Sequence, residues 1–160
     1  FAYQLFYRSN IMATKVAVQA MLERGGGGSV IFITSTRAFR AHADDCLYGS
    51  MKAALNRAVE TLALEFAPQG IRVNAVAPGN TWIFDDSTPT ELLAQQHRDW
   101  VPAGRPGTAR EVGQLVAYLA SEHAAYITGE VVKTDGGLIL PGVKETFPGM
   151  TPKMHGGWTS

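Results

Sequence analysis

The sequence of 160 residues contains a single cysteine, so no disulfide can form within the chain. It contains no apolar run close to the ~20 residues of a membrane-spanning helix. Fourteen basic residues balance fourteen acidic ones, so no net charge attracts nucleic acid or an anionic membrane surface. The first residues show no pattern of a secretory signal peptide. These absences predict a cytoplasmic protein that binds neither nucleic acid nor membrane.

The residues that are present predict an α/β protein. Apolar residues make up 46% of the chain and charged residues 18%, which is typical of a globular domain with a core. Helical patterns alternate with short apolar runs that suit strands buried on both faces, which predicts a parallel sheet with right-handed crossovers. We expect helices over 2–24, 47–66 and 108–121, and strands over 29–34, over 71–77 and within 127–137.

Two further segments have no regular pattern. Residues 80–106 form a long connection with a short helix expected around Glu91–Trp100, and connections of this length are often substrate lids. Residues 141–160 are rich in proline and glycine and predict an extended tail. We therefore expect a single domain over 1–140, a lid or substrate segment over about 80–106, and a tail over 141–160.

The chemistry of such a sheet is expected at the carboxyl ends of its strands, where ligands of open α/β sheets bind. Thr34 and Ser35 end the first strand, and Pro78 and Gly79 end the second. We expect these residues to face a common site.

Tyr48 and Lys52 lie four residues apart at the start of the second helix, and therefore share one helix face. A phenol titrates near 10 in water, and a nearby ammonium in a partly dry site stabilises its ionised form. A tyrosine with such a neighbour can exchange protons near neutral pH. Tyrosine–lysine pairs are also common on solvated helix faces, so this pair alone does not establish a site. Cys46, two residues earlier, is expected to be a small packing residue.

The surrounding motifs give the pair its context. Ser35 precedes it at a strand end, and Asn10 lies in the helix before that strand. The segments "RVNAVAPG" and "GRPGTAREVGQLVAYLASEHAAYITGEVVKTDGG" follow. With these motifs the chain resembles the short-chain dehydrogenase/reductase family from about residue 3 to 140. The resemblance implies a doubly wound parallel sheet of the Rossmann type.

The resemblance also implies roles for individual residues. Tyr48 would be the general acid/base, and Ser35 would hydrogen-bond the reacting oxygen. Lys52 would bind the nicotinamide ribose, and Asn10 would hold a water in a proton relay. The cofactor-binding candidates are Tyr48, Lys52, Pro78, Gly79 and Thr81, the last because Ile83 stands where the family often has threonine. The substrate-binding candidates are Ser35, Thr36, Trp82, Phe84 and Trp100.

The implied activity is the interconversion of a small-molecule alcohol and a carbonyl compound by hydride transfer with NAD or NADP. The family pattern also implies a homotetramer, with the helices that carry Asn10 and the Tyr48–Lys52 pair at one interface. No metal site is predicted, because the four histidines show no ligand spacing.

The chain departs from the family pattern at its start. The family's glycine-rich turn and the residue that selects NAD or NADP are not present, and Gly25–Gly28 cannot replace that turn because they follow a helix and precede a strand. We expect this chain to be the carboxyl-terminal part of the family fold, without the first half of the nucleotide-binding unit. On its own it is expected to be inactive, and the choice between NAD and NADP is not decided.

Two alternative interpretations stay open. The segments "SVIFITS", "PGNTWIFDDSTPTE" and "FPGM" are also similar to halohydrin dehalogenases, which release halide and form an epoxide without a nicotinamide. Those enzymes carry an arginine where this chain has Lys52, which favours the dehydrogenase. The second alternative is a truncated homologue without catalytic activity.

Overall fold

The computed structural model describes residues 1–83 and 101–140. Within these ranges the chain forms three α-helices, five strands and several short helical turns. The helices are α1 (Ser9–Glu23), which continues the π-helix Gln4–Arg8, α2 (Cys46–Phe66) and α4 (Ala109–Ala120). The strands are β1 (Gly28–Ile33), β2 (Ile71–Pro78), β3 (Thr81–Trp82), β4 (Gly107–Thr108) and β5 (Val131–Thr134).

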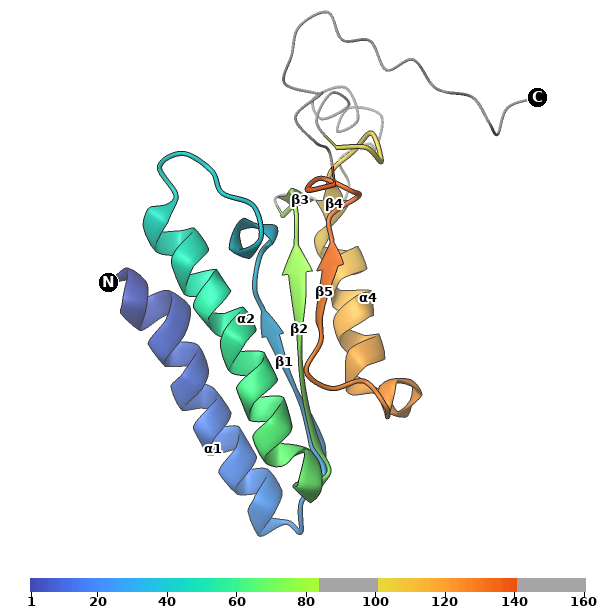
Figure 1. Ribbon diagram of the computed structural model, residues 1–160. Coiled ribbons are helices and arrows are strands. Elements are labelled where there is room, and N and C mark those ends of the chain that lie inside the picture. Colours follow the sequence, from blue (N-terminus) through green and yellow to red (C-terminus); the bar gives the residue numbers. More distant parts are fainter. Residues whose placement is uncertain (84–100, 141–160) are drawn as a thin grey trace, which may run out of the picture.

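The main sheet is parallel and has the strand order β1–β2–β5. Helices α1 and α2 cover one face of this sheet, and α4 covers the other (Figure 1). Ile33 of β1 pairs with Val76, and Pro78 of β2 pairs with Thr134. The carboxyl ends of all three strands therefore meet at one edge. This arrangement confirms the predicted doubly wound α/β fold.

The central strand β2 carries the core on both of its faces. Ile71 and Val73 are fully buried against Leu55 and Val59 of α2. On the opposite face, Val76 packs with Leu119 and Ala124 beside α4. Burying each such aliphatic side chain contributes about 1.5–3 kcal/mol, so a strand buried on both faces must be apolar almost throughout. The continuous apolar run in the sequence has this physical cause.

One fully buried polar side chain lies in this strand, and its hydrogen-bonding groups have partners. Asn74 is fully buried; its Nδ2 donates to the Ile127 carbonyl at 2.8 Å, and its Oδ1 accepts from the Glu130 amide at 3.0 Å. A buried amide is tolerated only when it is hydrogen-bonded. Asn74 therefore fixes the turn that leads into β5.

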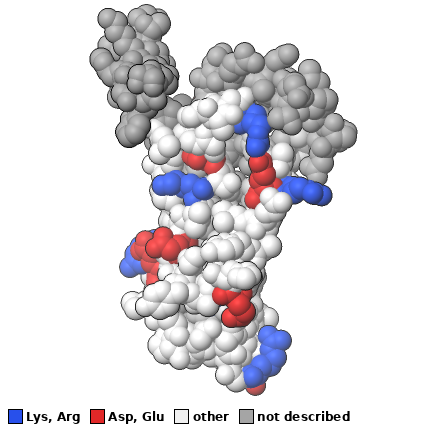
Figure 2. Space-filling view, turned by 90° about the vertical axis from the view of Figure 1, so that its right-hand side faces the viewer, with Lys and Arg blue, Asp and Glu red and all other residues white. Residues whose placement is uncertain are grey.

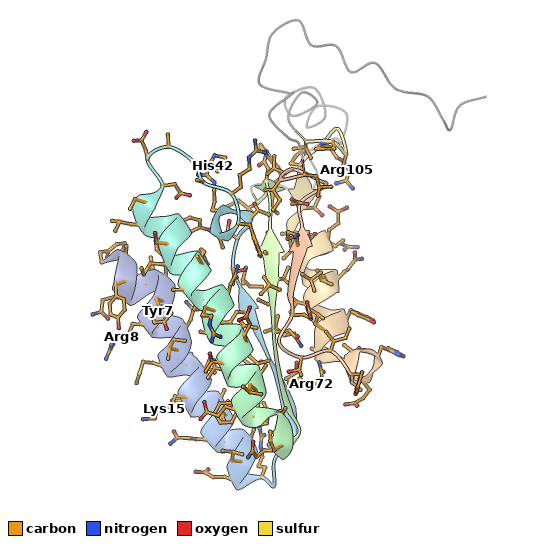
Figure 3. The ribbon with its side chains drawn as sticks, viewed as in Figure 1. Tyr7, Arg8, Lys15, His42, Arg72 and Arg105 are labelled. Atoms are coloured by element: carbon orange, nitrogen blue, oxygen red, sulfur yellow. The ribbon has the colours of Figure 1, made fainter. Side chains whose placement is uncertain are left out.

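Arg72 stabilises the start of the connection between α4 and β5. Its Nη1 donates to the Leu119 carbonyl at 2.7 Å and its Nη2 to the Ser121 carbonyl at 3.1 Å, where α4 ends. Figure 3 shows Arg72 at the end of the sheet opposite His42. A cation at a helix carboxyl end satisfies carbonyls that have no partner within the helix.

The glycine run Gly25–Gly28 connects α1 to β1 at the amino end of the sheet. All four residues have positive φ. The Gly27 amide donates to the Gln69 carbonyl at 2.8 Å, and a Cβ on Gly26 would lie 2.6 Å from that oxygen. The run is a tight connection away from the carboxyl ends of the strands, in agreement with its exclusion as a phosphate-binding turn.

Other expectations are confirmed in part. The predicted helix and strand positions agree with the structure to within a few residues, but the two-residue pairing of β3 with β4 was not predicted from the sequence. The helix expected around Glu91–Trp100 and the tail over 141–160 lie outside the described residues.

On the α4 side of the molecule, acidic and basic side chains are interspersed and form no patch of one sign (Figure 2). None of the helices within 1–83 and 101–140 is long and apolar enough to cross a membrane.

Candidate active site

The three strand ends are joined by short hydrogen bonds. The Thr34 amide donates to the Val76 carbonyl at 2.8 Å, and the Gly79 amide donates to the Thr134 carbonyl at 3.0 Å. A Cβ on Gly79 would lie 2.5 Å from the Cβ of Asp135, so only glycine fits there without displacing the backbone. The carboxylate of Asp135 in turn accepts hydrogen bonds from the amides of Gly137 and Ile139, at 2.9 and 3.1 Å. The Asp-Gly-Gly segment is therefore a structural turn.

Ser35 follows β1 at this edge, with extended backbone and only 8% of its surface exposed. Its Oγ accepts a hydrogen bond from the Arg37 amide at 3.1 Å, which begins a short 3₁₀ turn over Thr36–Ala38. A serine hydroxyl that accepts one hydrogen bond can still donate its own proton. Ser35 is therefore fixed in position and able to donate to a substrate oxygen.

Tyr48 and Lys52 lie on the first two turns of α2. The Nζ of Lys52 is 5.6 Å from the centroid of the Tyr48 ring and donates a hydrogen bond to the Ile33 carbonyl at 2.8 Å. The ring of Phe6 meets the Tyr48 ring edge to face at 5.1 Å and lies 6.0 Å from the Nζ. The ammonium is thus held between two aromatic rings and the end of β1. Sequence reasoning missed Phe6, because a helical aromatic residue carries no signal of what it contacts.

Burial of the Lys52 side chain lowers the pKa of its ammonium from its ordinary value of 10.5. Removing a cation from water disfavours its charged form, and the same low dielectric strengthens its attraction to a nearby anion. The site therefore holds a partly desolvated cation beside a phenol.

These residues line one cleft. A cavity of about 350 Å³ is bordered by Ser35 and Tyr48, and its other walls include the apolar side chains of Ile33, Ile83 and Val112. A neighbouring cavity of about 530 Å³ shares its walls with the first at four residues. Those shared residues are Ser35, Tyr48, Gly79 and Thr81. Of the other candidates, Lys52 and Pro78 line the first cavity, and Thr36 lines the second.

Among the described candidates, Asn10 and Trp82 line neither cavity. Asn10 lies in α1, where its Nδ2 donates to the Phe6 carbonyl at 3.1 Å and its carbonyl accepts from Thr14 Oγ1 at 2.8 Å. Asn10 lines neither cavity, although Phe6 connects it to Tyr48. Trp82 is half-buried in β3, and Phe84 and Trp100 lie outside the described residues.

The expectation for Cys46 was wrong. Its side chain is exposed and does not pack in the core. The first turn of α2 extends beyond the end of the sheet, so the helix has no strand to cover at this point (Figure 1).

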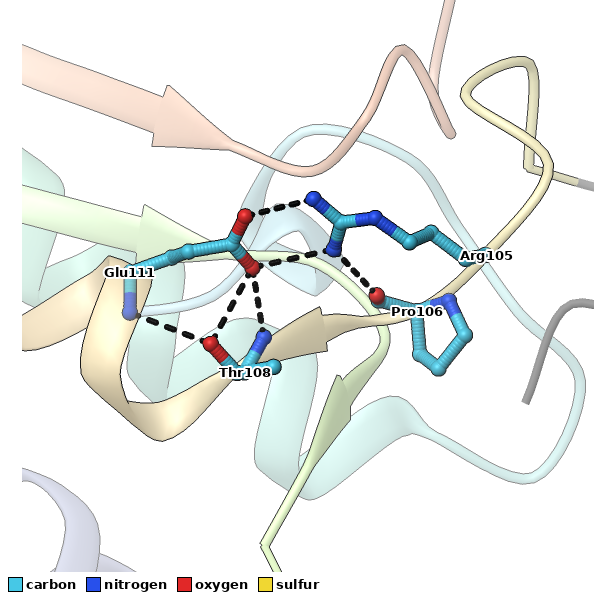
Figure 4. A network of polar contacts seen from close by, with 4 residues as sticks. All are labelled: Arg105, Pro106, Thr108 and Glu111. Atoms are coloured by element: carbon cyan, nitrogen blue, oxygen red, sulfur yellow. Dashed lines mark hydrogen bonds and ion pairs between the residues drawn. The ribbon is translucent and has the colours of Figure 1, made fainter. Parts of the chain in front are cut away.

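A network of polar contacts fixes the end of the connection between β2 and α4, at the point where α4 begins (Figure 4). The guanidinium of Arg105 binds the Glu111 carboxylate through two hydrogen bonds, at 2.6 and 3.1 Å. Glu111 also accepts from the Thr108 amide at 2.8 Å, and Thr108 Oγ1 accepts from the Glu111 amide at 3.2 Å. Thr108 and Glu111 therefore form a capping box at the start of α4, to which Arg105 adds an ion pair. Beside it, β3 pairs with β4, so both ends of the connection are held near the cleft.

These contacts change the ionisation of Glu111. The hydrogen bond from Arg105, followed by those from Thr108, lowers the pKa of the Glu111 carboxyl from its ordinary 4.5 to about 2, against the opposing effect of burial. The same hydrogen bond raises the pKa of Arg105.

The fold and the cleft define a class of protein: a doubly wound α/β protein with a serine, a tyrosine and a lysine gathered at the carboxyl ends of its strands. Comparison with known proteins identifies the family. The family model described as enoyl-(acyl carrier protein) reductase matches residues 2–139. A glucose 1-dehydrogenase from Gluconobacter oxydans is 36% identical over 139 residues, which cover 82% of this chain and 50% of that protein.

Solved structures agree with this identification. An acetoin dehydrogenase from Salmonella typhimurium matches with a TM-score of 0.78 and 31% identity, covering 88% of this chain and 55% of the other. A 7α-hydroxysteroid dehydrogenase in complex with NADH and 7-oxo glycochenodeoxycholic acid matches with a TM-score of 0.72 and 28% identity, covering 84% and 53%. The chain belongs to the short-chain dehydrogenase/reductase family, whose members are NAD(P)-dependent oxidoreductases.

The chain spans about half the length of the curated relatives that it matches. The predicted likeness to halohydrin dehalogenases finds no support among the relatives reported above.

The ionisation of Glu111 leads to a prediction about acid stability. A carboxyl whose pKa is lowered by folding contributes stability above its ordinary pKa, and this contribution is lost as the pH falls toward the folded value. The free energy of unfolding of Glu111→Gln should therefore fall below that of the wild type at pH 7, by about 1 kcal/mol because both partners are partly exposed. The difference should shrink between pH 4.5 and about 2.

Urea unfolding across this pH range measures the effect. Glu60→Gln is the matched control, because Glu60 forms an exposed pair with Arg57, and that substitution should change stability little at any pH. A difference in stability between the wild type and Glu111→Gln that stayed constant across the acid range would contradict the role given to the Arg105–Glu111 pair.

Proposed function

We propose that the protein containing this chain interconverts an alcohol and a carbonyl compound by hydride transfer with NAD(H) or NADP(H), and that Tyr48 is its general acid/base. The observation that carries this proposal is the gathering of Ser35, Tyr48 and Lys52 on one cleft at the carboxyl ends of β1 and β2. Family membership supports the class of reaction.

The cleft fits the nicotinamide half of the cofactor. The 350 Å³ cavity combines apolar walls, which suit a flat ring, with hydroxyl and ammonium donors that suit an adjoining ribose and carboxamide. Lys52 would hold the ribose, Pro78 and Gly79 would lie along the ring, and Thr81 would contact the carboxamide. When bound, the cofactor supplies or accepts the hydride. Lys52 already donates one hydrogen bond to Ile33, and an ammonium carries three N–H groups.

The side chains of the chain handle the proton. The hydroxyls of Ser35 and Tyr48 would both bind the substrate oxygen, on which negative charge develops as a carbonyl is reduced. Tyr48 would give its proton to that oxygen, or take one from an alcohol in the reverse direction. The Lys52 ammonium near its ring would stabilise the resulting phenolate. Asn10 would hold a water that carries the proton from Lys52 to solvent, supported by its link through Phe6 to Tyr48.

The substrate side of the cleft would be formed by Thr36 together with Trp82, Phe84 and Trp100 of the connection that follows β2. Relatives in this family carry the names of dehydrogenases for a sugar, for acetoin and for a steroid.

The assignment of Tyr48 predicts a specific defect. In the whole protein, Tyr48→Phe should lower kcat for carbonyl reduction by about 10²–10⁴-fold, because the proton donor is lost while the ring and its contact with Phe6 remain. The melting temperature should stay close to that of the wild type. The matched control is Tyr7→Phe, which removes the hydroxyl of the residue that follows Phe6 in the π-helix. This variant should reduce the carbonyl substrate as fast as the wild type does. Near-full activity in Tyr48→Phe would rule out Tyr48 as the acid/base.

We also propose that the protein is a homotetramer in which α1 and α2 form an interface. Both helices expose large apolar side chains, including Val16 and Leu64. Arg8 at the end of the π-helix and Lys15 of α1 point away from α2 (Figure 3). Sedimentation should give the mass of four chains, and Val16→Glu combined with Leu64→Glu should reduce it. A monomer in the wild type would refute the proposal.

A further inference from the structure

The cleft has two arms, which are the cavities of about 350 and 530 Å³ described above, and both are bordered by Ser35 and Tyr48. The first arm, with Ile33, Ile83 and Val112 on its walls, is largely apolar apart from Lys52 and threonine hydroxyls. The second arm has a different chemistry. Beyond the residues that the two arms share, its walls are Thr36, Arg37, His42, Asp45, Asn80 and Leu138.

The central feature of the second arm is an ion pair. Nη1 of Arg37 lies 3.1 Å from Oδ2 of Asp45. The Asp45 side chain is only 12% exposed, whereas the Arg37 side chain is 41% exposed. The pair is neutral as a unit and presents guanidinium donors and a carboxylate acceptor side by side. The amide of Asn80 and the ring of His42 add further donors and acceptors; Figure 3 shows His42 at the carboxyl-end side of the sheet.

This pair is connected to both catalytic candidates. The Arg37 amide donates to Ser35 Oγ at 3.1 Å. The amide of Gly49, the residue after Tyr48, donates to the Asp45 carbonyl at 3.0 Å. A Cβ on Gly49 would lie 3.1 Å from the Arg37 carbonyl oxygen and 3.2 Å from Asp45 Oδ2. The missing side chain at position 49 therefore lets the ion pair lie against the turn that carries Tyr48.

We propose that this second arm recognises the hydroxyl groups of a polyhydroxylated carbonyl substrate, such as an open-chain sugar, and that Arg37 and Asp45 determine this specificity. The inference rests on the function proposed above and names its substrate class. A hydroxyl group both donates and accepts hydrogen bonds. It therefore matches a neutral ion pair that offers guanidinium donors and a carboxylate acceptor. An apolar substrate would cover the pair without satisfying it, and a pair that is neutral as a unit offers no net charge to attract an anion. Sites built to bind a substrate hydroxyl reject analogues that lack it.

Three four-carbon carbonyl compounds test the proposal: erythrulose with three hydroxyls, butanone with none, and 2-oxobutanoate with a carboxylate. The whole protein should reduce erythrulose with a kcat/KM on the order of a hundredfold above that for butanone. Arg37→Gln and Asp45→Asn should each lower this ratio by about tenfold or more, since each removes a charged hydrogen-bonding partner. Arg37→Lys should restore part of it.

The control is Arg57→Gln, which removes an exposed arginine from α2 and should leave the ratio unchanged. A preference for 2-oxobutanoate, or a ratio of erythrulose to butanone that Arg37→Gln alters by less than about threefold, would overturn the proposal.

Cys46 provides a measurement that does not require turnover. It is exposed and lines a cavity of about 580 Å³ that also includes Arg37, His42 and Asp45. Erythritol, the alcohol corresponding to erythrulose, should slow alkylation of Cys46 in the wild type and not in Arg37→Gln, as followed by peptide mass spectrometry. Protection without turnover would refute the proposed reaction and support this binding site. Turnover of erythrulose with equal alkylation rates in the presence and absence of erythritol would refute the binding site alone.

Discussion

The structure depends on one constraint, which is that β2 is buried on both faces and paired in parallel on both edges. Val73 and Val76 lie at zero exposure on opposite faces of this strand, one against α2 and the other beside α4. Because β1 and β5 pair with β2 in parallel, all three carboxyl ends lie at one edge. The close approach of Gly79 to Asp135 and the hydrogen bond from Thr34 to Val76 follow from that register. The position of Ser35 beside Gly79 in the cleft therefore depends on the packing of a strand that carries no catalytic group except at its end.

Helix α2 supplies the rest of the site through a similar link. The Lys52 ammonium of α2 donates a hydrogen bond to the last carbonyl of β1. This bond fixes the position of the helix that carries Tyr48 relative to the strand that precedes Ser35. Partial burial of the same ammonium lowers its pKa. One side chain thus joins helix to strand and provides the positive charge that the proposed proton transfer needs.

Much of this could be predicted from the sequence, for local reasons. Strand positions follow from β-branched runs such as that before Thr34, and the start of α4 follows from the spacing of Thr108 and Glu111. The convergence of Ser35 with Gly79 follows from parallel topology alone. The identity of side chains in contact across elements could not be predicted. Phe6 against Tyr48 and Arg105 in the capping box depend on helix rotation and loop path, which no local pattern encodes. The position of Cys46 was mistaken because its helix begins beyond the edge of the sheet.

The central claim is that this cleft holds the nicotinamide half of a cofactor through Lys52, and titration of the whole protein with NADH and NADPH tests it most directly. We expect one of the two to bind, and Lys52→Met to weaken that binding by about tenfold or more, because a charged hydrogen-bond donor to the ribose is lost. Arg57→Met, an exposed substitution on the same helix, should leave the affinity unchanged. Failure of both nucleotides to bind the wild type, or equal affinity in Lys52→Met, would contradict this account.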